Sequence, residues 1–315
     1  MAKAVEIRKE STGAIVIAQS HLVTFIQEWI AFADVKPATQ ANYNKAVKKF
    51  FVYLQKQGIT QPSRQDVVNF RDNLLTTCKP STCALYLTSV KLFFRFLASK
   101  EYYANIADHV KGVKVDHSHK KDALAVEDTR RVLKSIDNST LKGKRDLAII
   151  SLMAACGLRS VEVIRADIGD IEKSYGKTFL RVWGKGRDGK VDSVLIPPQV
   201  EALINDYLQE RGAANINEPL FTSTSRRNAG QRLQTQTISR LAKSTFKSVG
   251  LDTPGLTCHS LRHTAATTML IHGVDIADVQ MILRHRNINT TQIYRHDISR
   301  MKNTGELTAA NAIFG

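Results

Sequence analysis

The stretch His259-Ser260-Leu261-Arg262-His263 places a histidine and an arginine three residues apart, and therefore on one face of a helix. Further along, Leu283-Arg284-His285 follows in a helix that Asp275 is predicted to begin. Tyr294 stands nine residues after this second histidine, and Gly157-Leu158-Arg159-Ser160-Val161-Glu162 lies about a hundred residues before the first stretch. We expect the fold to bring these segments together, because a histidine gains a role only from a partner.

These residue types suit the breaking of a phosphodiester bond. Without metal or water the reaction needs a nucleophile, cations for the charge on phosphorus, and an acid for the leaving oxygen. Arginine donates two parallel hydrogen bonds to a phosphate and stays charged, whereas lysine can also give up a proton. A tyrosine phenol, with a pKa of about 10, needs nearby cations to act as a nucleophile. The ordinary alternatives are a surface ion pair between Arg159 and Glu162 and a structural role for Tyr294.

Length and charge predict two domains and a polyanionic partner. The chain has 315 residues, a formal net charge of +16 and an isoelectric point of about 9.7. Residues 1–121 contain 18 basic and 9 acidic residues, and residues 122–315 contain 27 and 20. Because both halves are basic, two lobes that contact the same DNA are favoured over a globular enzyme with a basic tail. A basic surface that serves only solubility is the alternative.

Cysteine usage and hydropathy predict a protein of a reducing, cytoplasmic location without a metal site. The cysteines form no Cys-x-x-Cys pair, so neither a zinc site nor a disulfide framework is expected. No apolar stretch approaches the roughly 20 residues that cross a bilayer. Glu6 and Glu10 interrupt the first residues, which do not resemble a secretory signal.

Residues 20–110 are predicted to form a four-helix domain. Apolar residues recur at helical spacing in segments 21–32, 43–54, 66–75 and 81–98. The side chains expected to point inward include Phe25, Ile26, Trp29, Ile30, Phe32, Tyr43, Val47, Phe50, Phe51, Leu54, Leu85, Leu92, Phe93, Phe96 and Leu97. Aromatic residues at this spacing are typical of a helical core rather than of a base-stacking platform. Residues 1–19 receive no assignment.

Residues 111–122 are polar and basic without apolar periodicity, which predicts an interdomain linker before a second domain at 123–315. In that domain the β-rich runs Phe179–Trp183 and Val191–Ile196 flank a glycine-rich turn that contains Lys185, so a hairpin with a basic tip is expected. Helices are predicted at 126–136, 145–156, 199–211, 236–249, 260–272, 275–284 and 290–295. The predicted fold class is mainly α with one small sheet.

The chain resembles the tyrosine recombinase (phage integrase) family, and its Xer-like members and mobile-element integrases in particular. The family pattern is Gly-Leu-Arg-x-x-Glu, a lysine on a hairpin, His-x-x-Arg, a later His or Trp, and a Tyr. Six matches in this order span about 135 residues, with Glu162 in the supporting position; they are Arg159, Lys185, His259, Arg262, His285 and Tyr294. The resemblance implies an N-terminal four-helix core-binding (SAM-like) domain and a mostly helical catalytic domain with a small β-hairpin sheet.

The resemblance further implies a site-specific DNA recombinase that works without cofactor or external energy. Tyr294 would attack the scissile phosphate to give a 3′-phosphotyrosyl link, which a 5′-hydroxyl of the partner duplex reverses, through a Holliday junction. The two arginines would hold the nonbridging oxygens, Lys185 would protonate the leaving oxygen, and the two histidines would assist proton transfer and phosphate binding. Glu162 would hold the site together from behind.

The implied partners are double-stranded DNA and three further copies of the chain, in a homotetramer on two duplexes, with no membrane contact. The outcome would be integration or excision of a mobile element, or resolution of dimers, with DNA-bending or directionality factors as candidate accessories. The apolar tail, residues 306–315, would dock on a neighbouring subunit or pack back on its own domain.

Two other functions stay open at this point. One is a DNA-binding protein of the same fold that has lost catalysis, against which the intact Tyr294 and Lys185 argue. The other is a type IB topoisomerase, which shares the chemistry but acts as a monomer. The chain departs from the family pattern at Leu283-Arg284-His285, where Leu-Gly-His is frequent, so an extra cation lies beside the site or points to DNA. With about 20 residues before the first helix, no separate arm-binding domain is expected.

Overall fold

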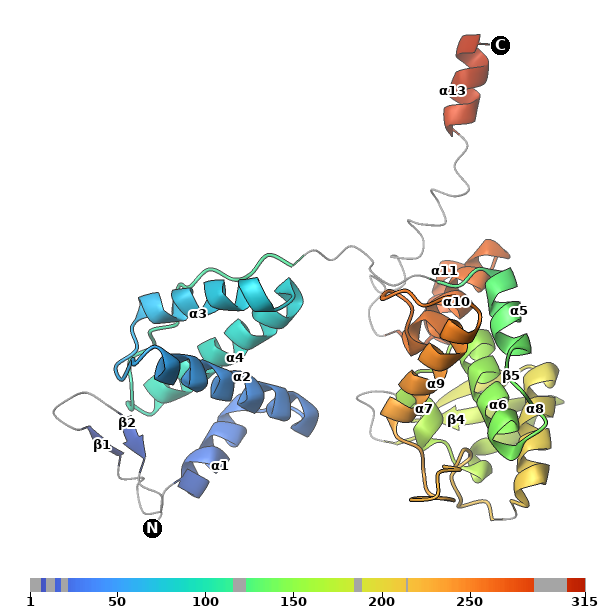
Figure 1. The fold of residues 1–315 in the computed structure, drawn as a ribbon, viewed down its shortest axis with the longest axis horizontal. Helices are drawn as coiled ribbons and strands as arrows, with labels where there is room; N and C mark the ends of the chain where they lie inside the picture. Colours follow the sequence, from blue (N-terminus) through green and yellow to red (C-terminus); the bar gives the residue numbers. More distant parts are fainter. Residues whose placement is uncertain are drawn as a thin grey trace. The chain divides into compact units, whose positions relative to one another are not determined.

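The chain folds around two separate hydrophobic cores, one in each of two compact units, Met1–Ser118 and His119–Gly315 (Figure 1). The structure, a computed structural model, describes residues 7–9, 15–17, 22–115, 123–183, 189–213, 215–285 and 305–314. The mainly helical fold with a small sheet is confirmed. Residues 116–122 of the expected linker lie outside the described residues, and the boundaries at 20–110, 111–122 and 123–315 stay a prediction.

Unit 1 is built from α1 (Leu22–Ala33), α2 (Pro37–Lys56), α3 (Arg64–Thr77) and α4 (Pro80–Ser99). Proline occupies the first position of α2 and α4, where its missing N–H has no helical partner to lose. At the start of α3 the backbone N–H of Ser63 donates to the Asp66 carboxylate at 2.8 Å. Helix α4 packs against the other three helices and carries the centre of the core.

Aromatic rings fill this core. Trp29 on α1 meets Phe93 on α4 edge to face, with 5.4 Å between ring centroids, and Phe25 meets Phe96 at 5.3 Å. The interpretation of the aromatic stripes as core is confirmed for these rings. The inward set was wrong for Phe51, which is 48% exposed, and for a group of aliphatic neighbours that are more than a third exposed, namely Ile26, Ile30 and Leu85. A helix buries residues spaced by three or four, and the adjacent residue points about 100° away from that stripe.

Unit 2 is organised around α6 (Leu141–Cys156), which is buried on nearly all sides. Helices α5 (Val126–Lys134), α8 (Pro198–Arg211) and α10 (Cys258–Ile271) pack against it. The prediction started this helix four residues late. Thr140 caps the helix by accepting from the backbone N–H of Gly143 at 3.0 Å, and the polar first turn hides the periodicity.

The predicted hairpin is present as β4 (Lys177–Val182) and β5 (Asp192–Ile196), and β5 packs against α6. A third strand, β3 (Ile171–Ser174), pairs antiparallel with β4 and was not predicted, because it is short and largely exposed. A separate pair, β1 (Ile7–Lys9) with β2 (Ile15–Ile17), forms in the segment that received no assignment.

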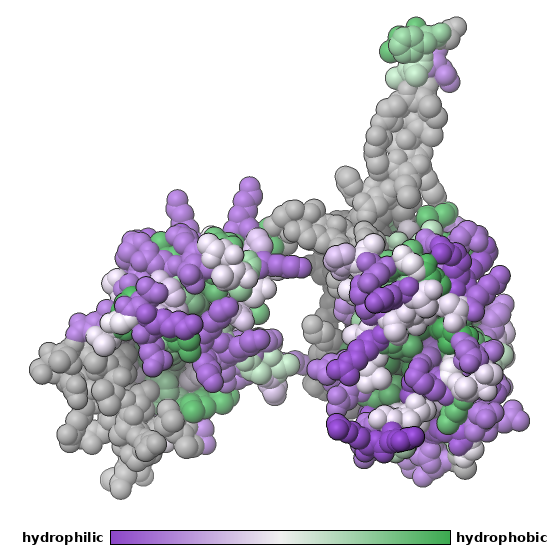
Figure 2. All heavy atoms as spheres, in the orientation of Figure 1, coloured by the Kyte–Doolittle hydropathy of each residue, from purple (hydrophilic) through white to green (hydrophobic). Residues whose placement is uncertain are grey.

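The other helices that the structure describes in unit 2 are α7 (Ser160–Arg165), α9 (Thr235–Ser248), α11 (Ile276–Ile282) and α13 (Gly305–Phe314), with a 3₁₀ turn at Ile168–Asp170. The apolar tail is thus helical, which the sequence analysis had not foreseen. The hairpin tip with Lys185 and the predicted helix at 290–295 lie outside the described residues. No helix that the structure describes is long and apolar enough to cross a membrane. Figure 2 shows hydrophilic side chains over most of the described surface of each unit in this view.

Candidate active site

Arg159 and Glu162 are joined at the start of α7. Gly157 ends α6 in the left-handed region, with φ +63°, and the chain turns into α7 at Ser160. The backbone N–H of Arg159 donates to Glu162 Oε2 at 2.8 Å, and Arg159 Nη1 donates to Oε1 at 2.7 Å. Because the Glu162 side chain is 0% exposed, the alternative of a surface ion pair is wrong.

Arg262, on α10, reaches the same carboxylate and the turn before α7. Its Nη1 donates to the carbonyl of Gly157 and its Nη2 to the carbonyl of Leu283, so one guanidinium ties together two chain turns. Its Nη1 also lies 4.0 Å from Glu162 Oε2. The expected meeting of Arg159, Glu162 and Arg262 is therefore found in the structure.

The turn at residues 283–285 completes the cluster. Arg284, with φ +56°, folds its side chain inward, and Nη2 donates to Glu162 Oε2 at 2.8 Å. The backbone carbonyl of Arg284 accepts from Arg159 Nη2 at 3.4 Å. The backbone N–H of His285 donates to the carbonyl of Gln280 at 3.0 Å. The side chain of Arg284 is 6% exposed, so the extra cation lies beside the site and not on the outer surface.

The charges in the cluster set the protonation of its two titratable members. Burial alone would raise the pKa of Glu162, but Arg284 and Arg159 outweigh it and hold that pKa below its ordinary value. Burial, together with Arg262, Arg159 and Arg284, lowers the pKa of His285 to about 3, although Glu162 opposes this. The cluster therefore holds an ionised carboxylate and a neutral imidazole at neutral pH.

A close approach between Gly157 and Leu283 holds the two turns together. A Cβ atom on Gly157 would lie 2.4 Å from Leu283 Cδ2 and would have to be carried at φ +63°, so glycine is strongly favoured there. Leu283 is fully buried with Ala266 and Val279 in a small core of their own. From the sequence, Gly157 is only the residue that follows the predicted helix at 145–156, and no local pattern pairs it with Leu283.

The other predicted site residues are placed differently. His259 is exposed at the second position of α10, one turn before Arg262. Lys185 and Tyr294 lie outside the described residues. A described lysine in the connection just before β5, Lys190, lies 2.6 Å from an oxygen of Asp167 and 2.5 Å from one of Asp170. Burial would lower the pKa of Lys190, but these two carboxylates raise it above its ordinary value, which suits a structural cation.

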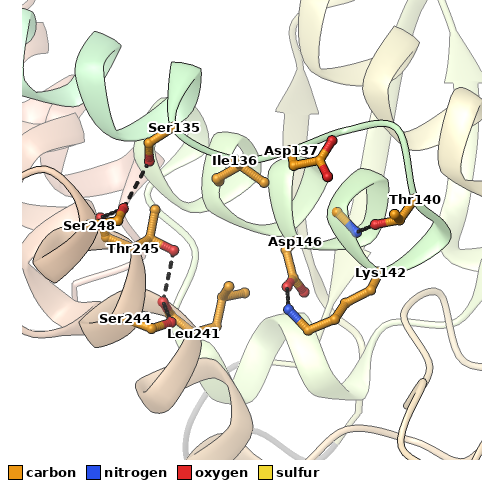
Figure 3. Close-up of a pocket in the computed structure, with 11 residues that line it drawn as sticks. Ser135, Ile136, Asp137, Thr140, Lys142, Asp146, Leu241, Ser244, Thr245 and Ser248 are labelled. Carbon is orange, nitrogen blue, oxygen red and sulfur yellow. Dashed lines mark hydrogen bonds and ion pairs between the residues drawn. The ribbon is translucent and has the colours of Figure 1, made fainter.

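A polar cavity of about 310 Å³ lies elsewhere in unit 2, between the end of α5, the start of α6 and the end of α9 (Figure 3). Its polar groups hydrogen-bond within the protein. Lys142 Nζ contacts Asp146 at 2.7 Å, Ser248 donates to Ser135 at 3.2 Å, and Thr245 donates to a backbone carbonyl at 2.9 Å. This internal satisfaction gives the cavity no evident ligand chemistry, and the arginine cluster remains the candidate site.

Comparison with known proteins agrees with this geometry. Residues 123–300 match the phage integrase family, and residues 22–104 match the phage integrase N-terminal SAM-like domain. The chain belongs to the phage integrase family. Its class of enzyme is the tyrosine recombinases, as the resemblance carried by the six residues implied.

Relatives and solved structures extend the likeness over most of the chain. The chain is 28% identical over 287 residues to tyrosine recombinase XerD of Staphylococcus haemolyticus, covering 87% of this chain and 94% of that protein. Its fold matches that of the XerH recombinase in a post-cleavage complex with palindromic difH, with a TM-score of 0.72 at 20% identity over 95% of this chain and 85% of that one. A lambda integrase tetramer bound to a Holliday junction matches with a TM-score of 0.66 at 16% identity, over 86% and 75% of the two chains.

Proposed function

We propose that this chain is a site-specific DNA recombinase that cleaves and rejoins strands through a 3′-phosphotyrosyl link to Tyr294, by way of a Holliday junction. The observation that carries the proposal is the buried cluster in which Arg159 and Arg262, 103 positions apart in the sequence, approach the same carboxylate of Glu162. Burying a charge costs free energy unless charged partners and hydrogen bonds compensate for it, and clusters of buried charges are typical of functional sites.

The roles follow from the chemistry of each group. The two arginines would hold the nonbridging oxygens of the scissile phosphate and offset the charge that develops on phosphorus. Because burial and the arginines lower the pKa of His285 to about 3 before DNA binds, we assign this ring a hydrogen bond to the phosphate rather than a positive charge. His259, exposed on α10, is in a position to meet the substrate, and we keep its role in proton transfer and phosphate binding.

Lys185 remains the proposed general acid for the leaving 5′-oxygen. Lys190 is unsuited to this role, because Asp167 and Asp170 hold its ammonium group and raise its pKa. A general acid works best when its pKa is near the working pH, and a lysine between two carboxylates is far from it. No metal or cofactor has a step in this scheme.

Double-stranded DNA is the proposed partner of both units, since each half of the chain is basic. We propose a homotetramer on two duplexes, in line with the lambda integrase tetramer that shares the fold. The helix α13 would be exchanged between subunits, because Ile313 and Phe314 are 72% and 87% exposed. An apolar cavity of about 300 Å³ on unit 2 is the candidate acceptor, and its lining includes Val126, Leu133, Ala154, Val200 and Leu203.

The tail proposal is tested by deleting residues 306–315. We expect the deletion to abolish synapsis of two duplexes and to leave binding of one duplex intact. Unchanged cleavage and synapsis would refute exchange and favour a tail that packs on its own domain.

The proposed biological outcome is integration or excision of a mobile element, or resolution of dimers. We propose that the protein acts in the cytoplasm, with DNA-bending or directionality factors as candidate partners.

The decisive experiment is a search for the covalent intermediate. The Tyr294→Phe protein is first used to select its binding site from random duplexes, and that site is built into a nicked suicide duplex. The wild-type protein is expected to form an adduct that survives a denaturing gel, and Tyr294→Phe is expected to bind without forming it. Tyr175→Phe, at a tyrosine that is 99% exposed, is the control and should react normally. Tight binding with no wild-type adduct would instead support the alternative of a catalytically inactive DNA-binding protein.

A further inference from the structure

The turn at 283–285 contacts both phosphate-binding arginines through its backbone. The Leu283 carbonyl accepts from Arg262, and the Arg284 carbonyl accepts from Arg159 at 3.4 Å. The Arg284 side chain in turn donates a hydrogen bond to the Glu162 carboxylate at 2.8 Å. One short turn therefore sets the positions of three groups that the proposed chemistry uses.

An arginine is an unfavourable residue at this position. Its backbone has φ +56°, a conformation that glycine adopts without strain and that a side chain makes costly. Its Nε is also buried with no hydrogen-bond partner among the residues that the structure describes. A strained residue with an unsatisfied donor persists when the surroundings use it, and such residues cluster at functional sites.

The net charge of the cluster indicates what Arg284 contributes to the site. Arg159, Arg262 and Arg284 bring three positive charges, Glu162 brings one negative charge, and His285 is neutral at pH 7. The pentacoordinate phosphorus of a phosphodiester carries two negative charges, one more than the ground state. With Arg284 offsetting Glu162, the charges of the other two arginines are left for the phosphate.

We propose that Arg284 is a positioning residue for strand cleavage, which holds the Glu162 carboxylate and thereby keeps the two phosphate-binding arginines in place. Arg284 acts through Glu162 and not on the DNA itself, because its Nη2 donates to that carboxylate at 2.8 Å and its Nη1 donates to the carbonyl of Ile282 at 2.6 Å. The proposal rests on the proposed function, because it concerns the same phosphate site.

The test compares Arg284→Gly and Arg284→Lys with the wild-type full-length chain on the suicide duplex selected above. The single-turnover cleavage rate at saturating protein and the Kd for the duplex are measured separately. We expect Arg284→Gly to cleave about 10- to 100-fold more slowly with an unchanged Kd, because a buried charge-assisted hydrogen bond is lost. Arg284→Lys, which keeps the charge, should recover part of the rate. Tyr175→Gly, which relieves φ +49° at an exposed turn, is the backbone control and should cleave normally.

Three results would overturn the proposal. The first is an Arg284→Gly variant that cleaves at the wild-type rate. The second is a variant with a higher Kd for the duplex and an unchanged cleavage rate at saturating protein, which would make Arg284 a DNA contact. If Arg284→Gly fails to fold, the cleavage rate of Arg284→Lys is compared with that of Arg284→Met. Equal cleavage rates for these two variants are the third result that would overturn the proposal. Absence of any wild-type adduct would refute the proposed function itself, so the two failures are distinct.

Discussion

Replacing Glu162 by glutamine is expected to destabilise unit 2 by about 3–5 kcal/mol at pH 7, the usual cost of removing one partner from a buried ion pair. The wild-type carboxylate accepts from the Arg159 backbone at 2.8 Å, from Arg159 Nη1 at 2.7 Å and from Arg284 Nη2 at 2.8 Å. Glutamine keeps one acceptor oxygen and turns an amide donor toward these donors. A loss of this size is a large part of the 5–15 kcal/mol that stabilises a typical domain.

The difference in unfolding free energy between the wild type and Glu162→Gln should depend on pH. The folded pKa of Glu162 lies below its ordinary value of 4.5, so the unfolded chain binds a proton at that residue more readily. The stability contributed by the ionised group is fully present above the unfolded pKa and is lost as pH falls through the folded pKa. We therefore expect the gap between wild type and Glu162→Gln to be constant above about pH 5 and to narrow below it.

Urea unfolding followed by the fluorescence of Trp183 measures this gap. The chain has two tryptophans, Trp29 in unit 1 and Trp183 in unit 2, and a Trp29→Phe background leaves the second as the reporter. Glu127→Gln is the control, because that carboxylate is 76% exposed in its pair with Arg130 and should change stability little. A loss below about 1 kcal/mol at pH 7, or a gap that stays constant into acid, would refute the electrostatic account.

Three further outcomes are expected. Gly157→Ala should lower the unfolding temperature and the cleavage rate, because its Cβ would lie 2.4 Å from Leu283 and its φ is +63°; a wild-type melting curve would contradict the close approach. His285, with its pKa lowered to about 3 by burial and the surrounding arginines, should not titrate between pH 5 and 8 in NMR spectra assigned with His285→Gln, and a titrating resonance would show that the ring is charged there. Lys190→Ala should reduce the urea midpoint of unit 2, because it removes the cation 2.5 Å from buried Asp170 and leaves that carboxylate the more distant Arg181 at 3.7 Å, whereas Lys185→Ala should slow cleavage at unchanged stability. Equal stability of the two lysine variants would count against these separate roles.

The arrangement explains why the polar cavity at the start of α6 is not the candidate site. The proposed phosphate site is formed by side chains at helix starts and turns, at Arg159 before α7 and at Arg284 after α11. Its groups hydrogen-bond to one another until a substrate arrives, so the site is dense rather than hollow. The cavity between α6 and α9, by contrast, is open, and its hydroxyls hydrogen-bond to one another or to backbone carbonyls.

Some errors of the sequence analysis have a common cause. The late start of α6 and the missed strand β3 both involve segments whose polar residues hide the apolar period. The exposed Phe51 was assigned inward because hydrophobic residues beside a core stripe look the same in sequence as residues within it. Periodicity identifies that a face exists, but only the packed neighbours decide how wide it is.

Local spacing and residue chemistry were enough to predict the family and the mainly helical class, and to mark Arg159, Glu162, Arg262 and His285 as candidate site residues. Only the tertiary structure decided that Glu162 is fully buried, that Leu283 packs beneath Gly157, and that Arg284 points inward onto the carboxylate. These facts depend on contacts between segments more than a hundred residues apart, as Arg284 is from Glu162. A local pattern holds no information on which distant groups share a desolvated space, and that sharing sets the pKa of His285.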